Sequence, residues 1–214
     1  MFDKNWEKNI YKKNRQINNY PSEWVVSNTY KYIIKKNNCL DLGSGAGNNL
    51  YFFLNYGFKN IDSIEGSDTA CKIQLKKFSN NKKIKVFNLD FNKFKFKKDN
   101  YNLILDRGSI THNKFNDIQK ILSKISKSLK KDGYFFSVMF SSQSSYTTKK
   151  DGFAFKKILD EKIGLRSNFF SESEIKNLLK DFTIINLTLQ KNETKIPNKS
   201  NISVWNIICQ KKIS

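Results

Sequence analysis

Hydrophobic residues recur along the chain at two spacings, and these spacings predict where strands and helices lie. Short apolar runs rich in β-branched and aromatic residues predict strands, whereas apolar positions three and four residues apart predict amphipathic helices. The predicted strands cover residues 38–42, 61–65, 83–89, 101–105, 134–140, 183–189 and 203–210. The predicted helices cover residues 21–36, 48–56, 68–78, 116–131 and 171–180.

The order of these elements predicts the fold class. Strands and helices alternate as far as residue 140, which is the pattern of a parallel sheet covered by helices on both faces. The last two strands follow one another without a long helix, so we expect them to pair antiparallel. The prediction is a doubly wound α/β fold of seven strands, the last antiparallel, in a single domain over residues 1–214.

Two segments fall outside this alternation. Residues 1–36 form a polar lead-in followed by a helix, and we expect them to act as an N-terminal cover. Residues 141–168 are rich in Ser, Thr and Lys and too long for an ordinary connection, so we expect a lid over a functional site. Partial disorder of this second segment is the alternative.

The composition excludes several classes of protein. At 214 residues the chain suits one globular domain, and its longest apolar run, near residues 134–140, is far too short to cross a membrane. Its polar start is unlike a signal peptide, so we expect a cytoplasmic protein. Cys39, Cys71 and Cys209 lie scattered in apolar contexts, which favours buried thiols over a zinc site.

The formal charge of +20 raises the question of a nucleic-acid partner. Cationic side chains that neutralise phosphates release counterions and drive such binding. All but three of the 39 basic residues are lysine, however, and they are spread along the whole chain together with many asparagines. We interpret this excess as compositional drift, which leaves the arginines, with their planar fork of donors, as the informative cations: Arg15, Arg107 and Arg166.

A glycine-rich loop follows the first predicted strand, in the stretch LDLGSGAGNNLYFF. A strand, a glycine turn and a helix N-terminus together form a site where backbone N–H groups face a ligand. The dinucleotide fingerprint GxGxxG requires a third glycine where this chain has Asn48. The loop therefore argues against a nicotinamide cofactor. Instead, an acid, Asp41, is followed by three glycines at every second position: Gly43, Gly45 and Gly47.

With this loop the chain resembles the class I S-adenosylmethionine (SAM) dependent methyltransferases, whose first motif is an acid followed by GxGxG. Glu65 ends the second predicted strand, where the family has an acid for the ribose hydroxyls, and Asp90 with Phe91 ends the third, where the family binds adenine. The resemblance covers roughly residues 22–211 and implies the Rossmann-like methyltransferase fold. It implies cofactor contacts by Asp41, Gly43, Ser44, Gly45, Gly47, Glu65, Gly66, Asp90, Phe91 and Asp106.

The end of the fourth strand, DRGSITH, lies where the family places acceptor-side residues. Methyl transfer to a hydroxyl needs alignment and a base, and His112 is the only histidine of the chain. We predict catalytic roles for His112, Arg107 and Asp106, with His112 as general base. The alternatives are that His112 only fixes the loop and that Arg107 only pairs with Asp106 or Glu65.

The chain lacks several motifs, and their absence argues against some classes of methyl acceptor. Methylation of base nitrogens is associated with an Asn/Asp-Pro-Pro-aromatic motif, and this chain has only Pro21 and Pro197. Cytosine C5 chemistry uses a Pro-Cys nucleophile, which is missing here. The metal-dependent catechol type of the resembled family has an acidic cluster after its fifth strand, where this chain has serines, so the resemblance implies no metal. Arg107 and Arg166 suit a phosphate or carboxylate.

We therefore expect an O-methyltransferase for a small anionic acceptor. In its compact size the chain resembles methyltransferases of surface-polysaccharide (capsule) biosynthesis, which act on sugars or on phosphoramidate. Three aromatic residues of the N-terminal segment would then either cover the site or only pack within the protein: Trp6, Tyr11 and Tyr20. Two rival functions remain: an RNA ribose 2′-O-methyltransferase that uses the lysines, and a SAM-binding partner without activity of its own.

Overall fold

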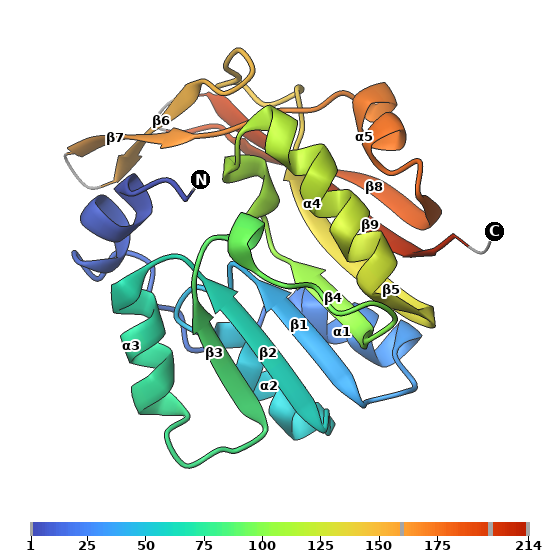
Figure 1. Cartoon of the computed structure of the whole chain (residues 1–214). Helices are drawn as coiled ribbons and strands as arrows, with labels where there is room; N and C mark the ends of the chain where they lie inside the picture. The colour runs from blue at the N-terminus through green and yellow to red at the C-terminus, as the bar shows by residue number, and fades with distance from the viewer. Residues whose placement is uncertain (1, 159–160, 197–198, 213–214) are drawn as a thin grey trace.

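The computed structural model describes residues 2–158, 161–196 and 199–212 (Figure 1). Its α-helices are α1 (Glu23–Tyr32), α2 (Asn48–Tyr56), α3 (Asp68–Lys77), α4 (Phe115–Ser128) and α5 (Glu172–Leu178). Its strands are β1 (Asn38–Leu42), β2 (Asn60–Glu65), β3 (Ile84–Asn88), β4 (Tyr101–Asp106), β5 (Leu129–Phe140), β6 (Phe153–Ile158), β7 (Glu161–Arg166), β8 (Phe182–Thr194) and β9 (Ser200–Lys211). Shorter helical turns are η1 (Trp6–Tyr11), η2 (Phe91–Lys93) and η3 (Ile110–His112).

The central sheet has seven strands in the order β3-β2-β1-β4-β5-β9-β8. The pairs among β1 to β5 are parallel, and β9 runs antiparallel to both β5 and β8. The strand order reverses between β1 and β4, where Leu42 lies opposite Ile64 on one side and Asp106 on the other. The predicted doubly wound α/β fold with seven strands, the last antiparallel, is confirmed.

Helices cover both faces of the sheet, and alternate residues of each strand point to opposite faces. Leu40 and Leu42 of β1 pack in the core beneath α4 and α5, whereas Cys39 of the same strand packs beneath α1 and α2. Figure 1 shows this layering with the sheet between the two groups of helices. Cys39, Cys71 and Cys209 are all buried free thiols.

The end of α4 differs from its prediction. The periodicity predicts a helix to residue 131 stopped by Asp132-Gly133, but α4 ends at Ser128 and β5 already begins at Leu129. Leu129 is fully buried and pairs with Tyr101 of β4, so a buried strand contact overrides the helical pattern. Gly133 lies inside β5, where a Cβ would come within 2.6 Å of the Tyr101 carbonyl oxygen.

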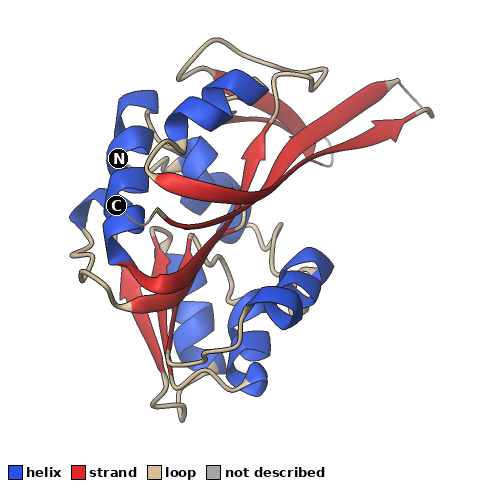
Figure 2. Ribbon diagram, turned by 90° about the vertical axis from the view of Figure 1, so that its right-hand side faces the viewer, coloured by secondary structure: helices blue, strands red, loops and turns tan. Residues whose placement is uncertain are grey.

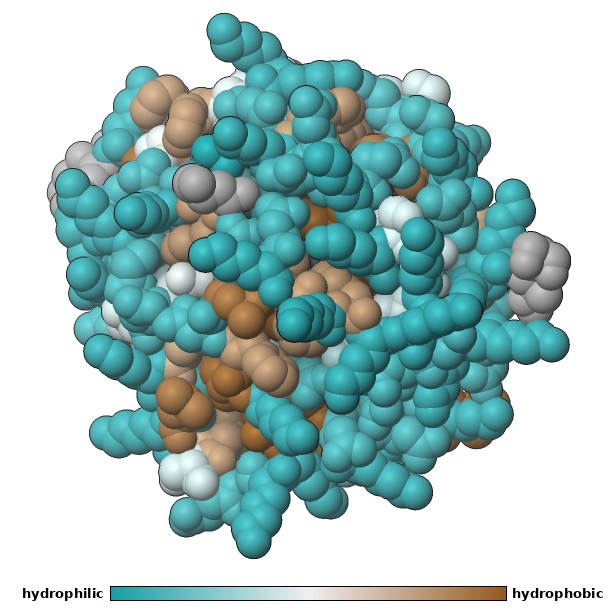
Figure 3. Space-filling model, viewed as in Figure 1, coloured by the Kyte–Doolittle hydropathy of each residue, from teal (hydrophilic) through white to brown (hydrophobic). Residues whose placement is uncertain are grey.

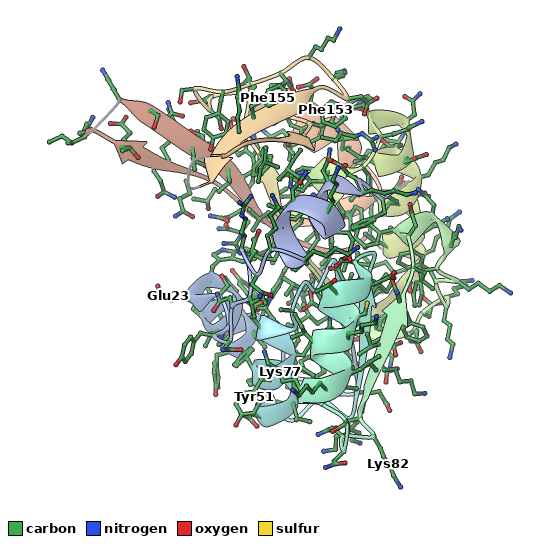
Figure 4. The ribbon with its side chains drawn as sticks, turned by 90° about the vertical axis from the view of Figure 1, so that its left-hand side faces the viewer. Glu23, Tyr51, Lys77, Lys82, Phe153 and Phe155 are labelled. Carbon is green, nitrogen blue, oxygen red and sulfur yellow. The ribbon has the colours of Figure 1, made fainter. Side chains whose placement is uncertain are left out.

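The segment 141–168 contains regular structure that its composition does not predict. Strands β6 and β7 pair antiparallel within it and form a separate two-stranded sheet. Residues 159–160 of the predicted lid lie outside the described residues. Figure 4 shows η1 of the N-terminal segment between this hairpin and α3, with Phe153 and Phe155 labelled on the hairpin. The two segments outside the sequence pattern are therefore neighbours in space.

The β8–β9 hairpin is longer than predicted and projects beyond the body of the molecule (Figure 2). Its outer part is mostly exposed, whereas its base completes the sheet against β5. The face seen in Figure 3 is covered mainly by hydrophilic side chains, and apolar residues gather near its middle. Within the described residues, no helix is long and apolar enough to cross a membrane.

Candidate functional site

The carboxyl ends of β1 to β4 meet at one edge of the sheet, and a cavity opens there. This edge, at the reversal of strand order, is where open α/β sheets bind ligands. One side of the cavity consists of loops that follow the strands: Gly43, Glu65, Gly66, Leu89, Asp90, Phe91, Arg107, Gly108, Ser109, His112 and Asn113. The other side comes from the N-terminal segment: Phe2, Asp3, Trp6, Tyr11 and Gln16.

The glycine loop takes a conformation that side chains would obstruct. Gly43, Gly45 and Gly47 all have positive φ, at 64°, 58° and 79°. A Cβ on Gly43 would come within 2.3 Å of the Ser109 Cβ, so glycine lets the loop after β1 pass directly against the loop after β4. The loop thus joins the two strands that flank the reversal.

Glu65 holds the glycine loop from the neighbouring strand. Its Oε2 accepts the Gly45 N–H at 2.8 Å and its Oε1 accepts the Ser67 N–H at 2.8 Å. Burial raises the pKa of Glu65, and these backbone donors oppose the rise. The residue lines the cavity, and a carboxylate has further lone pairs with which to accept ribose hydroxyls.

Asp41 lies beneath the loop, fully out of contact with water. Burial raises its pKa to about 8, the carboxyls of Asp106 and Glu65 add to the rise, and a hydrogen bond from Asn49 opposes it. Its Oδ2 has no hydrogen-bond partner in the part of the chain that the structure describes. A buried carboxyl with an unused oxygen fits a cationic ligand group nearby, such as an amino group.

Asp106 organises the turn after β4 rather than the cavity wall. Its Oδ1 accepts the Ser109 and Ile110 N–H groups at 2.7 and 2.9 Å, and its Oδ2 accepts the Ser137 hydroxyl at 2.7 Å. Ser109 in turn donates its hydroxyl to the Leu42 carbonyl at 2.7 Å. Asp106 therefore holds the acceptor-side turn against β1.

His112 lies at the far end of this turn and lines the cavity. Its Nδ1 is 2.5 Å from the Arg166 carbonyl oxygen, and its ring meets the Trp6 and Phe140 rings edge-on at 4.9 and 5.4 Å. A carbonyl can only accept, so Nδ1 carries the proton and Nε2 keeps its lone pair. Burial lowers the pKa of His112, which favours the neutral ring.

The N-terminal segment reaches into the part of the cavity predicted for adenine. The backbone N–H of Phe2 donates to the Asp90 carboxylate. The Phe2 ring lies directly on Gly66, where a Cβ would come within 2.4 Å of it. Tyr11 lies in the same way over Gly45, with its hydroxyl 2.7 Å from the position of a Cβ. An aromatic ring and an N–H donor of the protein itself thus contact Gly66 and Asp90.

The two arginines of the acceptor prediction occupy different places. Arg107 lines the cavity, and its Nε donates to the Ser22 hydroxyl at the start of α1 at 3.4 Å. Arg166 contributes backbone contacts to His112 and Asp3.

The predicted site residues divide into two groups in the structure. Seven line the cavity together: Gly43, Glu65, Gly66, Asp90, Phe91, Arg107 and His112. The others lie behind them: Asp41, Ser44, Gly45, Gly47 and Asp106. The sequence-based prediction lacks several lining residues: Phe2, Asp3, Gln16, Leu89, Gly108, Ser109 and Asn113. Gly108 and Ser109 carried a signal, because they stand in the DRGSITH turn after β4.

No group of three or more His, Cys, Asp or Glu side chains within residues 2–158, 161–196 and 199–212 is arranged to hold a metal ion.

Comparison with known proteins bears on this site. The family model described as "Methyltransferase domain" matches residues 12–185. No curated protein matches the chain by sequence.

Solved structures of similar fold include three with named sources. A SAM-dependent methyltransferase from Methanosarcina mazei is 18% identical with a TM-score of 0.69, covering 91% of this chain and 100% of that one. TehB from Haemophilus influenzae is 18% identical with a TM-score of 0.69, covering 89% and 63%. The 1,6-didemethyltoxoflavin-N1-methyltransferase of Burkholderia thailandensis, solved with its substrate and S-adenosylhomocysteine, is 15% identical with a TM-score of 0.65, covering 95% and 84%.

Proposed function

The chain belongs to the methyltransferase domain family and is a SAM-dependent enzyme, and from this premise we propose that it methylates an oxygen of a small anionic acceptor. The observation that carries the proposal is the position of His112 in the same cavity as the glycine loop and Glu65. A histidine whose Nε2 is free to accept a proton stands beside the cofactor site.

Several features of the cavity fit SAM. The glycine loop leaves backbone close to a ligand, and Glu65 can accept ribose hydroxyls. Asp41, behind the cavity wall, has a buried oxygen without a hydrogen-bond partner among the described residues. Gly66, Asp90 and Phe91 surround the place where an adenine ring would lie. When bound, SAM supplies a methyl group on a positively charged sulfur, which an acceptor oxygen displaces in line.

The role we assign to His112 is general base. The Arg166 carbonyl fixes the proton on Nδ1, so Nε2 is the atom that takes the proton from the acceptor hydroxyl. The lowered pKa of His112 keeps the ring neutral, and therefore able to accept a proton, at neutral pH. The acceptor oxygen forms its bond to the methyl carbon as that proton moves to Nε2. Asp106 supports the same reaction by holding the Ser109 turn.

Arg107 is the residue we assign to the negative charge of the acceptor. It lines the cavity within the same turn as His112, and a guanidinium pairs with phosphate or carboxylate through two parallel hydrogen bonds. Arg166, whose backbone carbonyl holds His112, is a second candidate for this charge. The assignment of Arg107 rests on its position in the cavity and on its chemistry, and that of Arg166 rests on its chemistry.

The acceptor class that we favour is a phosphorylated or nucleotide-linked sugar, or a phosphoramidate, of a surface-polysaccharide pathway. A small acceptor is supported by the Burkholderia protein of similar fold, which is named for methylation of a small molecule. We place the reaction in the cytoplasm. The β6–β7 hairpin and the N-terminal segment serve, in this proposal, as the lid and the cover of a single domain.

The experiment that tests this function is transfer of labelled methyl from SAM into two fractions of a cell extract, small metabolites and total RNA. The Glu65→Ala variant serves as the blank, because Glu65 holds the glycine loop. Label in the metabolite fraction that depends on Glu65 supports the proposal and yields a product to identify by mass. Label in RNA would overturn it and assign the net charge of +20 to RNA binding.

A further inference from the structure

The end of β7 connects His112 to an acid of the N-terminal segment. Arg166 lies opposite Phe153 in the hairpin, and the hydrogen bond that closes this end runs from the Ser167 N–H to the Gly152 carbonyl at 2.9 Å. The N–H and C=O of Arg166 therefore face away from β6. Both are used: the carbonyl by His112 Nδ1 at 2.5 Å and the N–H by Asp3 Oδ2 at 2.9 Å.

Asp3 is held firmly enough to fix this strand end. Only 8% of its surface is exposed, and its second oxygen, Oδ1, accepts the Asn5 N–H at 3.0 Å. Asn5 itself donates its side-chain amide to the Gly164 carbonyl at 3.1 Å. The N-terminal segment is thus fastened to β7 at two places, Gly164 and Arg166.

A small apolar core reinforces the same contact. Ile10 packs against Ile163 and Leu165 of β7, with Trp6 beside them, and the first three are almost completely buried. This cluster is separate from the two cores beneath the main sheet. The N-terminal segment, which lines the cavity, and the hairpin therefore form one packed unit.

We propose that Asp3 is a positioning residue for the base, because it fixes the Arg166 carbonyl that holds His112 and places a negative charge beside the imidazole. This inference rests on the proposed function of His112. A carboxylate near a histidine favours the imidazolium that forms when Nε2 takes the acceptor proton. Asp3 therefore acts through the β7 backbone and through its charge.

Uncharged and charged groups other than Asp3 also surround His112. Trp6 of η1 and Phe140 of β5 contribute uncharged rings, and the Ser167 hydroxyl lies 3.4 Å from Nδ1. The cationic residues on this side are Arg107, in the same turn, and Arg166, whose backbone holds the ring. Asp3 is the acid whose charge acts on the imidazole, and it raises the pKa of His112 against the effect of burial.

Nuclear magnetic resonance of tag-free protein labelled at histidine tests the proposal directly, since His112 is the only histidine. The wild-type imidazole should show the Nδ1–H tautomer. Asp3→Asn keeps an oxygen for the Arg166 N–H but loses the charge, so the tautomer should persist while the pKa of His112 shifts down. Asp3→Ala loses both and should mix the tautomers. Asp132→Asn, an acid paired with Lys35 outside the cavity, is the matched control and should change neither.

Kinetics provide the second readout. Asp3→Ala should lower kcat about 10- to 100-fold, as loss of a partner that orients a histidine does elsewhere, without changing KM for SAM. Asp3→Asn should recover part of that loss. Unchanged nitrogen shifts and titration in both Asp3 variants would overturn the proposal. Full activity of His112→Asn would instead overturn the assignment of His112 as base. That activity is measured separately from the effect of the Asp3 variants on the imidazole.

Discussion

The backbone N–H of Phe2 donates to the carboxylate of Asp90, the acid at the end of β3. At the same time the Phe2 ring lies on Gly66, the residue after Glu65 at the end of β2. An adenine ring would present a flat face and an amino donor to these same two residues. In the proposed cofactor site, Phe2 therefore occupies the adenine end of the cavity, and we expect it to leave before SAM binds.

Phe2→Ala should consequently raise the apparent affinity for SAM, by about threefold to tenfold. The apparent Kd equals the intrinsic Kd divided by the fraction of molecules with an open site, and removing the ring increases that fraction. Titration calorimetry with SAM measures the change. Ile17→Ala, in the same segment but exposed, is the matched control and should bind SAM as the wild type does. Weaker binding by Phe2→Ala would mean that Phe2 contacts the bound cofactor instead.

Gly43→Ala should lose SAM binding and destabilise the fold. The residue has a φ of 64°, and the added methyl group would come within 2.3 Å of the Ser109 Cβ. Gly57→Ala is the matched control, since Gly57 also has positive φ but its nearest neighbour would be 3.7 Å away, in Lys36. The control should cost about 1–2 kcal/mol from backbone strain alone and keep SAM binding. Equal losses in both variants, measured by urea unfolding and calorimetry, would contradict the close contact of the two loops.

The buried Asp41 predicts an unusual pH dependence of stability. Its pKa is raised to about 8 in the folded chain, whereas an unfolded aspartate has a pKa near 3.9 and is ionised throughout neutral pH. Unfolding therefore releases a proton between pH 6.5 and 8, and the free energy of unfolding should fall as pH rises, by up to about 1.4 kcal/mol per pH unit. Above pH 8 this dependence should disappear.

Urea unfolding of the cofactor-free protein at pH 6.5, 7.2 and 8 measures this slope. The Asp41→Asn variant should show a flatter dependence, because its side chain does not titrate. His112 adds an opposite slope near pH 6.5, because its pKa is lowered in the folded chain while the unfolded imidazole still binds a proton there, and this contribution is the same in both proteins. The same slope in both proteins would show that Asp41 is already ionised in the folded state.

Arg107→Ala should weaken acceptor binding without weakening SAM binding. A hydrogen bond to a charged group contributes about 1.5–3 kcal/mol, which corresponds to a rise in acceptor KM of about 10- to 100-fold. Arg15→Ala is the control, because Arg15 donates to the Asn9 carbonyl within the N-terminal segment. An equal loss of SAM affinity in Arg107→Ala would indicate that Arg107, through Ser22, holds the structure rather than the acceptor.

Most of the central fold could be predicted because its signals are local. The strands β1 to β4 are short apolar runs bounded by polar turns, and the helix after Ser171 begins with a capping box that the structure contains. The end of α4 could not be predicted, because the pairing of Leu129 with Tyr101 is a contact between distant residues. The β6–β7 hairpin was missed for a related reason: its packing partner is Ile10, at the other end of the chain.

The residues of the candidate site likewise divide into those with a local sequence signal and those placed by contacts between distant parts of the chain. Gly43, Glu65 and Asp90 stand at strand ends, where the fold itself specifies a ligand edge, so the sequence could indicate them. Phe2 and Asp3 carry no motif, and their places depend on how the N-terminal segment packs against β7. Sequence reasoning also could not separate the residues on the cavity wall from those behind it, such as Asp106.

The role of His112 as the base of a methyl transfer to oxygen can be tested by a single rate comparison. His112→Asn can still donate an amide N–H toward the Arg166 carbonyl but offers no nitrogen to take a proton. With saturating SAM and the acceptor found in the metabolite fraction, kcat should fall about 10²- to 10⁴-fold while SAM affinity stays the same. Transfer at the wild-type rate would contradict the account and leave His112 as a residue that only holds its loop.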